Sequence, residues 1–190
     1  MVAIILVAVI ALLGGWLAVM FNSLVSLRNR VANAFKQIDV QLKRRYDLIP
    51  NLVSAVKGEM KFESETLERV IKARAAAVAA SAGASVADIS KKEGELSQAL
   101  GRLIALSENY PNLKASDAVR GLMEELTSTE NKIAFARQFY NDIVTAFNTS
   151  QQVFPNNLVA AALGFKPAEL FEIPESAKQE REVPKVDLSV

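Results

Sequence analysis

The feature that most constrains this chain is its opening stretch, MVAIILVAVIALLGGWLAVMFNSLVSL, which carries no charged side chain before Arg28. Residues 2–21 form an apolar run of about 20 residues, which as a helix spans a hydrocarbon core about 30 Å thick. A secretory signal peptide would show a cationic start, a shorter apolar stretch and a small-residue cleavage site, and none of these is clear here. The run therefore predicts an uncleaved transmembrane anchor over residues 1–22.

Basic residues on one side of the run predict its orientation. None precedes it, whereas Arg28, Arg30 and Lys36 follow within about 15 residues. Because cytoplasmic flanks of membrane spans are enriched in Lys and Arg, we expect the N-terminus outside and the body in the cytoplasm. Membrane lipid is accordingly an expected partner.

The composition excludes several classes of chemistry. With no Cys and no His, the chain cannot form disulfides, thiolate metal sites, His-based triads or histidine-containing zinc and di-iron motifs. A net charge of +1 gives no bulk attraction to nucleic acid. We therefore expect no enzyme and no catalytic, cofactor-binding or metal-binding residues. A carboxylate-only hydrolase using Glu63, Glu65 and Glu68 is the remaining enzymatic alternative, although these acids are more typical of a solvated helix face.

The body of the chain has the apolar spacing of helices throughout, with steps of three and four residues. The strictest repeat has a spacing of seven and comprises Val119, Leu126, Ile133, Tyr140, Phe147 and Phe154. Ser85 is a good N-terminal cap, Pro111 cannot continue a helix, and a long helix is expected from Ser116-Asp117 to about residue 154. The pattern predicts an all-α fold with almost no strand.

The C-terminal third divides into two further segments. Residues 157–165, NLVAAALGF, are apolar but too short to span a bilayer. They can pack on the end of the bundle or lie in a membrane interface, and we favour packing because they lack a cationic face. From Pro174 onward the chain is charged and proline-spaced. The predicted domains are thus an anchor at 1–22, a helical bundle at 23–173 and a flexible charged tail at 174–190.

The stretch QLKRRYDLIPNLVSAV, residues 41–56, admits several interpretations. A nucleic-acid surface is disfavoured by the balanced net charge, and no nucleic-acid partner is expected. Contact with lipid headgroups is disfavoured because Lys43 would lie about 33 Å along the helix from Phe21. That distance exceeds the Debye length of about 8 Å, so salt would screen the attraction between Lys43 and the headgroups. A catalytic corner is disfavoured because Asp47 has no nucleophile or metal partner in the pattern.

A helix junction at Pro50 fits this stretch best, because proline removes an N–H and crowds the carbonyl of Tyr46. Whether the chain reverses at residues 47–50 or only later, near 58–64, stays open. Arg45 falls on the core-facing row, so we expect it to pair with an acid such as Glu130 or Asp142. The candidate interhelical polar cluster comprises Arg44, Arg45, Asp47, Arg137, Asn141 and Asp142, with ordinary solvated charges as the alternative.

Several of these stretches resemble the LemA family of bacterial membrane proteins. The similarity includes QIDVQLKRRYDLIPNLV, ENYPNLKA, ARQFYNDIVTAFN and FPNNLVAAALGFKP, and it extends in order over nearly the whole chain. This chain departs from the family at Phe35, where relatives often carry Trp, and at Phe62, where many carry His. The second departure argues against a required metal or acid–base role at that position.

The resemblance implies a four-helix, up-and-down bundle behind one N-terminal span in a bacterial inner membrane. It implies no agreed activity and no catalytic residues, although some relatives are linked to organising membrane compartments and some are encoded near membrane proteases. We therefore expect a membrane-anchored helical scaffold that forms a homo-oligomer or docks another membrane protein. The alternative is a monomeric adaptor or regulator of a membrane enzyme such as a protease.

Overall fold

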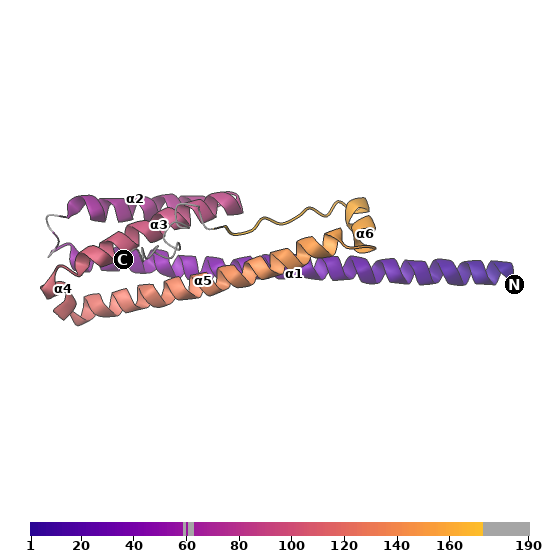
Figure 1. Ribbon diagram of the computed structural model, residues 1–190, viewed down its shortest axis with the longest axis horizontal. Coiled ribbons are helices and arrows are strands. Elements are labelled where there is room, and N and C mark those ends of the chain that lie inside the picture. The colour runs from indigo at the N-terminus through magenta and orange to yellow at the C-terminus, as the bar shows by residue number, and fades with distance from the viewer. Residues whose placement is uncertain (59, 61–62, 173–190) are drawn as a thin grey trace, which may run out of the picture. The chain divides into compact units, whose positions relative to one another are not determined.

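The structure is a computed structural model that describes residues 1–58, 60 and 63–172 (Figure 1). Helices and short connections make up the described residues, which contain no strand. The helices are α1 (Val2–Val56), α2 (Ser64–Ser81), α3 (Val86–Ser107), α4 (Pro111–Ala115), α5 (Asp117–Gln152) and α6 (Asn156–Ala162). The predicted all-α class is confirmed, whereas the four-helix up-and-down arrangement stays a prediction.

The chain forms two compact units. Unit 1 comprises Met1–Val40 with Ile133–Leu170, and unit 2 comprises Gln41–Lys132 with Phe171 and Glu172. Each unit therefore contains one part of α1 and one part of α5. The predicted boundary between anchor and bundle at residues 22 and 23 stays a prediction, and the predicted tail at 174–190 lies outside the described residues.

Helix ends follow the local chemistry of the sequence. The Ser85 side chain accepts a hydrogen bond from the Asp88 backbone N–H at 3.1 Å and so caps α3, as predicted. Gly83, just before it, has a φ of +149°, which favours glycine over residues with a Cβ. Pro111 begins the short helix α4, and α5 begins at Asp117. The sequence placed all three of these boundaries within a few residues.

Of the two places left open for the chain to reverse, residues 47–50 and residues 58–64, the structure excludes the first. Pro50 lies inside α1, which continues without interruption to Val56, and the next helix begins at Ser64. The physical reason is a substitute donor, because Arg74 Nε donates to the Tyr46 carbonyl oxygen at 2.7 Å. That carbonyl is the one that a residue at position 50 would normally bond, so Arg74 replaces the N–H that proline lacks.

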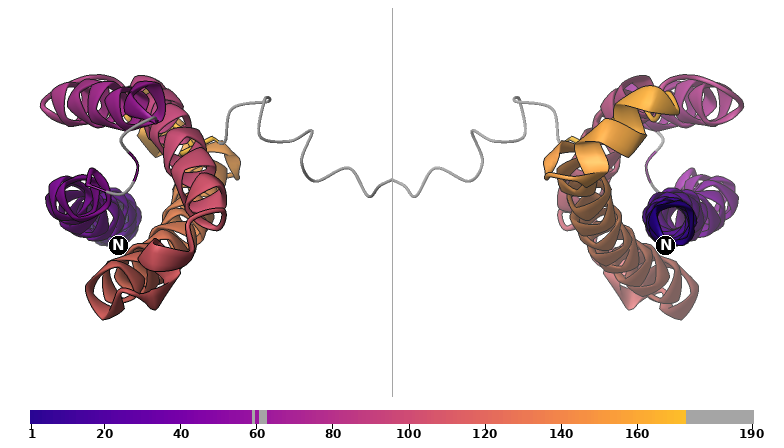
Figure 2. Two further views of the ribbon diagram at one scale, coloured as in Figure 1. Left: turned by 90° about the vertical axis from the view of Figure 1, so that its left-hand side faces the viewer. Right: turned by 90° about the vertical axis from the view of Figure 1, so that its right-hand side faces the viewer.

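In unit 2, α2 and α3 pack side by side (Figure 1, Figure 2). Their buried faces follow the helical spacing expected of a core. The buried apolar residues of these two helices are Leu67, Val70, Ala77, Ile89, Leu96, Ala99, Leu100 and Leu103. Glu93 lies on the same buried face of α3.

In unit 1, the short helix α6 packs against α1 just beyond the apolar run. Val159 and Ala160 form a buried apolar cluster with Met20 and Leu24, and Phe165 packs against it. The prediction that residues 157–165 pack against the helical body is thereby confirmed for their buried side. Farther along this unit, Tyr140 stacks edge-on against Phe35 with ring centroids 5.7 Å apart.

The Tyr140 hydroxyl is buried in unit 1 and donates to the Glu169 carbonyl oxygen at 2.8 Å. Burial raises the pKa of the Tyr140 phenol above its ordinary value of 10.0, and the negative charge of Glu169 adds to this increase. The phenol therefore stays protonated in the folded chain at a pH where an exposed tyrosine would ionise.

The apolar run is the exposed beginning of α1. Within the described residues, α1 is the one helix long and apolar enough to cross a membrane, with a mean hydropathy of 2.8 over its most apolar window. None of that window is buried against the rest of the chain. Large apolar side chains such as Ile4, Leu12 and Leu13 are more than half exposed.

Candidate functional site

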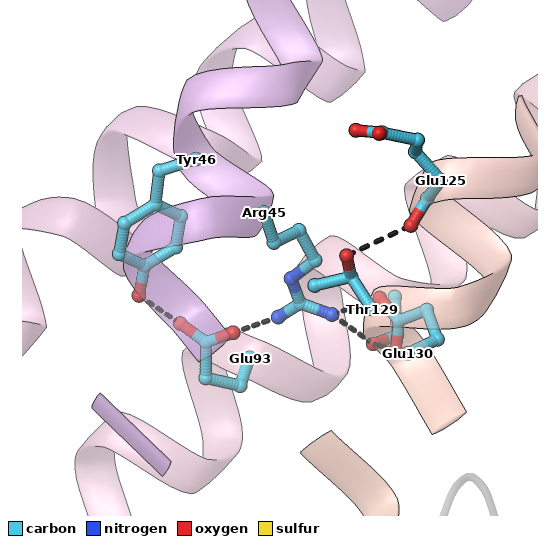
Figure 3. A network of polar contacts seen from close by, with 7 residues as sticks. Arg45, Tyr46, Glu93, Glu125, Thr129 and Glu130 are labelled. Atoms are coloured by element: carbon cyan, nitrogen blue, oxygen red, sulfur yellow. Dashed lines mark hydrogen bonds and ion pairs between the residues drawn. The ribbon is translucent and has the colours of Figure 1, made fainter. Parts of the chain in front are cut away.

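The most unusual feature of the described residues is a charged network buried in unit 2, centred on Arg45 (Figure 3). Arg45 is 1% exposed. Its Nη2 pairs with Glu93, and its Nη1 pairs with Glu130 and donates to Ser97 Oγ at 2.9 Å. One guanidinium from α1 thus joins carboxylates from α3 and α5.

Tyr46 extends the network along α1. Its hydroxyl donates to the second carboxylate oxygen of Glu93, so that Glu93 accepts from two neighbouring residues of α1 (Figure 3). The backbone carbonyl of Tyr46 accepts from Arg74 of α2, as described above. Side chains of α1, α2, α3 and α5 therefore meet in one connected set, which we call the Arg45 network: Arg45, Tyr46, Arg74, Glu93, Ser97 and Glu130.

The chemistry of the Arg45 network is that of a specific junction between helices. Removing charges from water costs several kcal/mol per ion, about as much as their mutual attraction returns, so such a pair adds little net stability. It does require its partners, because a buried charge left alone is strongly destabilising. Glu93 is 2% exposed, and each of its two carboxylate oxygens accepts from a different donor of α1. A different packing of α3 against α1 would therefore break at least one of these two hydrogen bonds.

The six residues of the predicted polar cluster divide between the two units. Arg44, Arg45 and Asp47 lie in unit 2, whereas Arg137, Asn141 and Asp142 lie in unit 1. Of the two acids proposed as partners for Arg45, the structure gives it Glu130. Arg44 lies 3.6 Å from Glu125 in a half-exposed ion pair, and Asp47 and Asp142 are exposed. The cluster as a single group stays a prediction.

Glu93 and Arg74 were not predicted as members of the site, although the sequence pattern contains a signal for both. Glu93 lies four residues after Ile89 and three before Leu96, which are both apolar and buried. Arg74 likewise lies four residues after Val70 and three before Ala77, on the buried face of α2. A charged residue at a core-facing position predicts a buried partner of opposite charge or a backbone group that needs one.

The acids considered for a hydrolase make ordinary surface contacts instead. Glu65 pairs with Arg69 and Glu68 pairs with Lys72, both along the exposed surface of α2. Glu63 accepts a hydrogen bond from the Tyr110 hydroxyl at 3.2 Å. Among the described residues, no group of three or more carboxylates is arranged to hold a metal ion. The solvated-face interpretation of these acids therefore fits the structure better than a catalytic one.

Comparisons with known proteins identify a family and several relatives that this chain resembles. The family model described as LemA family matches residues 34–188. The magnetosome protein MamQ 2 of Paramagnetospirillum magneticum is 25% identical over 175 residues, covering 80% of this chain and 64% of that protein. Protein LemA of Metamycoplasma hominis is 28% identical over 159 residues, covering 81% of this chain and 69% of that protein. The chain therefore spans less than two thirds of the MamQ relative that it matches.

The family match includes α1 from Ala34 onward, with the whole of the Arg45 network, and continues through α6. It begins after the apolar run. On the strength of this match over most of its length, the chain belongs to the LemA family.

Proposed function

We propose that this chain is a non-enzymatic, membrane-anchored helical scaffold that self-associates at a bacterial inner membrane. The observation that carries the proposal is the continuity of α1. Its first part exposes an apolar surface of membrane-spanning length, and its last part holds the buried Arg45 network. A single helix with an exposed apolar segment at one end and buried ion pairs at the other is suited to holding a folded domain at a bilayer.

Two alternatives for the apolar part of α1 are weaker. A core helix of a soluble protein passes the same length test but would be buried, and this window is not. A signal sequence would be separated from the body after its apolar stretch. Here the helix continues without a break into Leu24, which is fully buried in unit 1. The basic residues after the run support an N-terminus outside and a body in the cytoplasm.

The scaffold role, with a four-helix bundle as its body, is supported by the relatives. It also agrees with the finding that the described residues contain no cluster of acids that could hold a metal ion. Three relatives are named as magnetosome proteins. A protein that organises a membrane by assembly needs surface for contact with other copies. Phe135 and Phe139 lie four residues apart on α5 and are 72% and 46% exposed. Copies tethered in one membrane meet at high effective concentration, so a small apolar contact is sufficient.

Native mass measurement of the full chain in detergent tests the proposal. We expect a discrete oligomer for the wild type, and a shift towards monomer for the double variant Phe135→Ser, Phe139→Ser. The matched control is Ile71→Ser, which removes a half-exposed apolar side chain from α2 and is expected to leave the oligomer unchanged. A wild type that is monomeric would overturn self-association and favour an adaptor or regulator of a membrane enzyme.

A further inference from the structure

Unit 1 brings together two stretches of sequence that lack charge. The first is residues 1–27, and the second is residues 143–165, which carry no charged side chain between Asp142 and Lys166. The end of α5, helix α6 and the residues after it make up the second stretch. In a chain in which 23% of residues are charged, two uncharged stretches meeting at one place call for a physical explanation.

Helix α6 has one covered side and one uncovered side. Val159 and Ala160 are buried against Met20 and Leu24 of α1. Several large apolar side chains around the same helix remain open: Phe154 is 78% exposed, Leu158 62%, Leu163 56% and Val153 47%. We call these four residues the α6 apolar rim. Packing on α1 explains the buried side of α6 but leaves the α6 apolar rim without a partner in the described residues.

The position of α6 along α1 matches the boundary of a bilayer. The apolar run ends at Phe21, and Leu24 lies only three residues farther, or about 5 Å along the helix axis. Phe21 also contacts Phe165 edge-on, with ring centroids 6.1 Å apart. Helices that lie in the membrane interface are buried about 5–10 Å into the boundary between headgroups and acyl chains, which is the level that these contacts give α6.

Cations border this uncharged surface on the side away from the apolar run. The Arg28 guanidinium carbon lies 5.5 Å from the centre of the Phe165 ring, and Lys166 follows directly in sequence. Arg28 is about 6 Å farther along α1 than Leu24. Residues 157–165 contain no cation, and for that reason their sequence favoured packing on the bundle over a position in the membrane interface. In the folded unit, α1 supplies that cation through Arg28.

From these observations we propose that the α6 apolar rim is a second lipid contact, inserted into the interface of the same membrane that holds the apolar run. Arg28 and Lys166 then face the phosphates of the headgroups. The proposal rests on the proposed anchor, because the depth of α6 is set by where α1 enters the bilayer. A second copy of this chain covering the rim is the competing occupant, and the continuity of the rim with the apolar run favours lipid.

Depth-dependent fluorescence quenching in vesicles of phosphatidylcholine and phosphatidylglycerol tests this contact. The chain has no native cysteine, so Leu158→Cys and, independently, Leu163→Cys can be labelled with an environment-sensitive fluorophore in the full-length protein. Ile71→Cys, from an exposed position on α2, is the matched control. Trp16 is the one tryptophan of the chain and reports on the apolar run in the same samples.

We expect lipids brominated near the headgroup end to quench the labels at positions 158 and 163 at least about twofold more than the label at 71, and aqueous iodide to show the reverse order. Trp16 should be quenched by deeply brominated lipids. Quenching of Trp16 without quenching at 158 and 163 would overturn the second contact and leave the anchor standing. Labels shielded from both quenchers would identify a protein partner on the rim and overturn the lipid contact. No lipid quenching at any position would overturn both proposals.

Discussion

The two units treat charge in opposite ways along the same helix. In unit 2, α1 places Arg45 in the interior, where it is joined to two carboxylates and neighboured by a buried tyrosine hydroxyl. In unit 1, α1 meets α6 through Met20 and Leu24, which form a buried cluster of apolar side chains with Val159 and Ala160. The difference shows how one continuous helix can serve two environments. Apolar contacts hold its first part against α6, and directional ion pairs hold its last part against α3 and α5.

The two units should also differ in how well they tolerate substitutions. Apolar packing is non-directional, so the contact of α6 with α1 should accept similar apolar residues. The Arg45 network depends on partners at fixed positions, so loss of one partner should be far more costly than its modest net stability implies. Variants in the two units therefore test different physical claims.

The largest effect is expected for Glu93→Ala, measured as the change in free energy of unfolding of the full chain in detergent. The variant leaves the buried Arg45 without one of its two carboxylate partners and removes the carboxylate that accepts from the Tyr46 hydroxyl, which should cost about 3–5 kcal/mol. Glu93→Gln keeps one acceptor oxygen for the Arg45 guanidinium, and its NH2 group can donate to the Tyr46 hydroxyl oxygen, so this variant should cost less. The control Glu68→Ala removes a surface ion pair and should change stability by under about 0.5 kcal/mol. Equal costs for Glu93→Ala and Glu68→Ala would contradict a buried network.

A smaller effect is expected for Arg74→Ala, which removes the donor to the Tyr46 carbonyl. We expect a loss of about 1.5–3 kcal/mol, the usual contribution of a hydrogen bond to a charged group. In a Pro50→Ala background the restored N–H can bond that carbonyl, so Arg74→Ala should cost much less there. A double-mutant cycle with urea unfolding measures the coupling. Additive costs would show that Arg74 does not compensate for Pro50.

The smallest effect is expected for Tyr140→Phe in unit 1, about 1 kcal/mol for the lost bond to the Glu169 carbonyl. Because burial raises the pKa of Tyr140, the folded chain holds a proton that the unfolded chain releases above pH 10. The stabilisation is therefore complete below pH 10 and is lost as pH rises through the folded pKa. The stability gap between wild type and variant should narrow above pH 10 in thermal melts. If the difference in stability between wild type and variant widened above pH 10, the pKa of Tyr140 would be lowered by folding, which would contradict this prediction.

Much of the fold was predictable because helix ends depend on nearby residues. Ser85, Pro111 and Ser116-Asp117 each fix a boundary through local chemistry, without help from distant parts of the chain. Pro50 was predicted less well for the opposite reason. Its effect on α1 depends on Arg74, which lies in another helix, and a local rule cannot include a donor that arrives only on folding.

The candidate site was predictable for Arg45 and less so for its partners. The core-facing position of Arg45 pointed to an acid across the helix interface, and Glu130 was one of two acids named. Glu93 was missed because no acid was considered on α3, although its spacing from Ile89 and Leu96 places it on the buried face. A charged residue at a core-facing position indicates that it needs a partner of opposite charge. The sequence pattern does not indicate as readily which helix provides that partner.

Amide hydrogen exchange of the full chain in lipid bilayers tests the central claim that α1 is held by lipid in its first part and by the Arg45 network in its last part. For the wild type we predict slow exchange in peptides from residues 2–21 and from residues 41–56. In Glu93→Ala, the second set should exchange faster while the first set stays protected. Fast exchange of residues 2–21 in lipid, or equal loss of protection in both sets, would contradict the account.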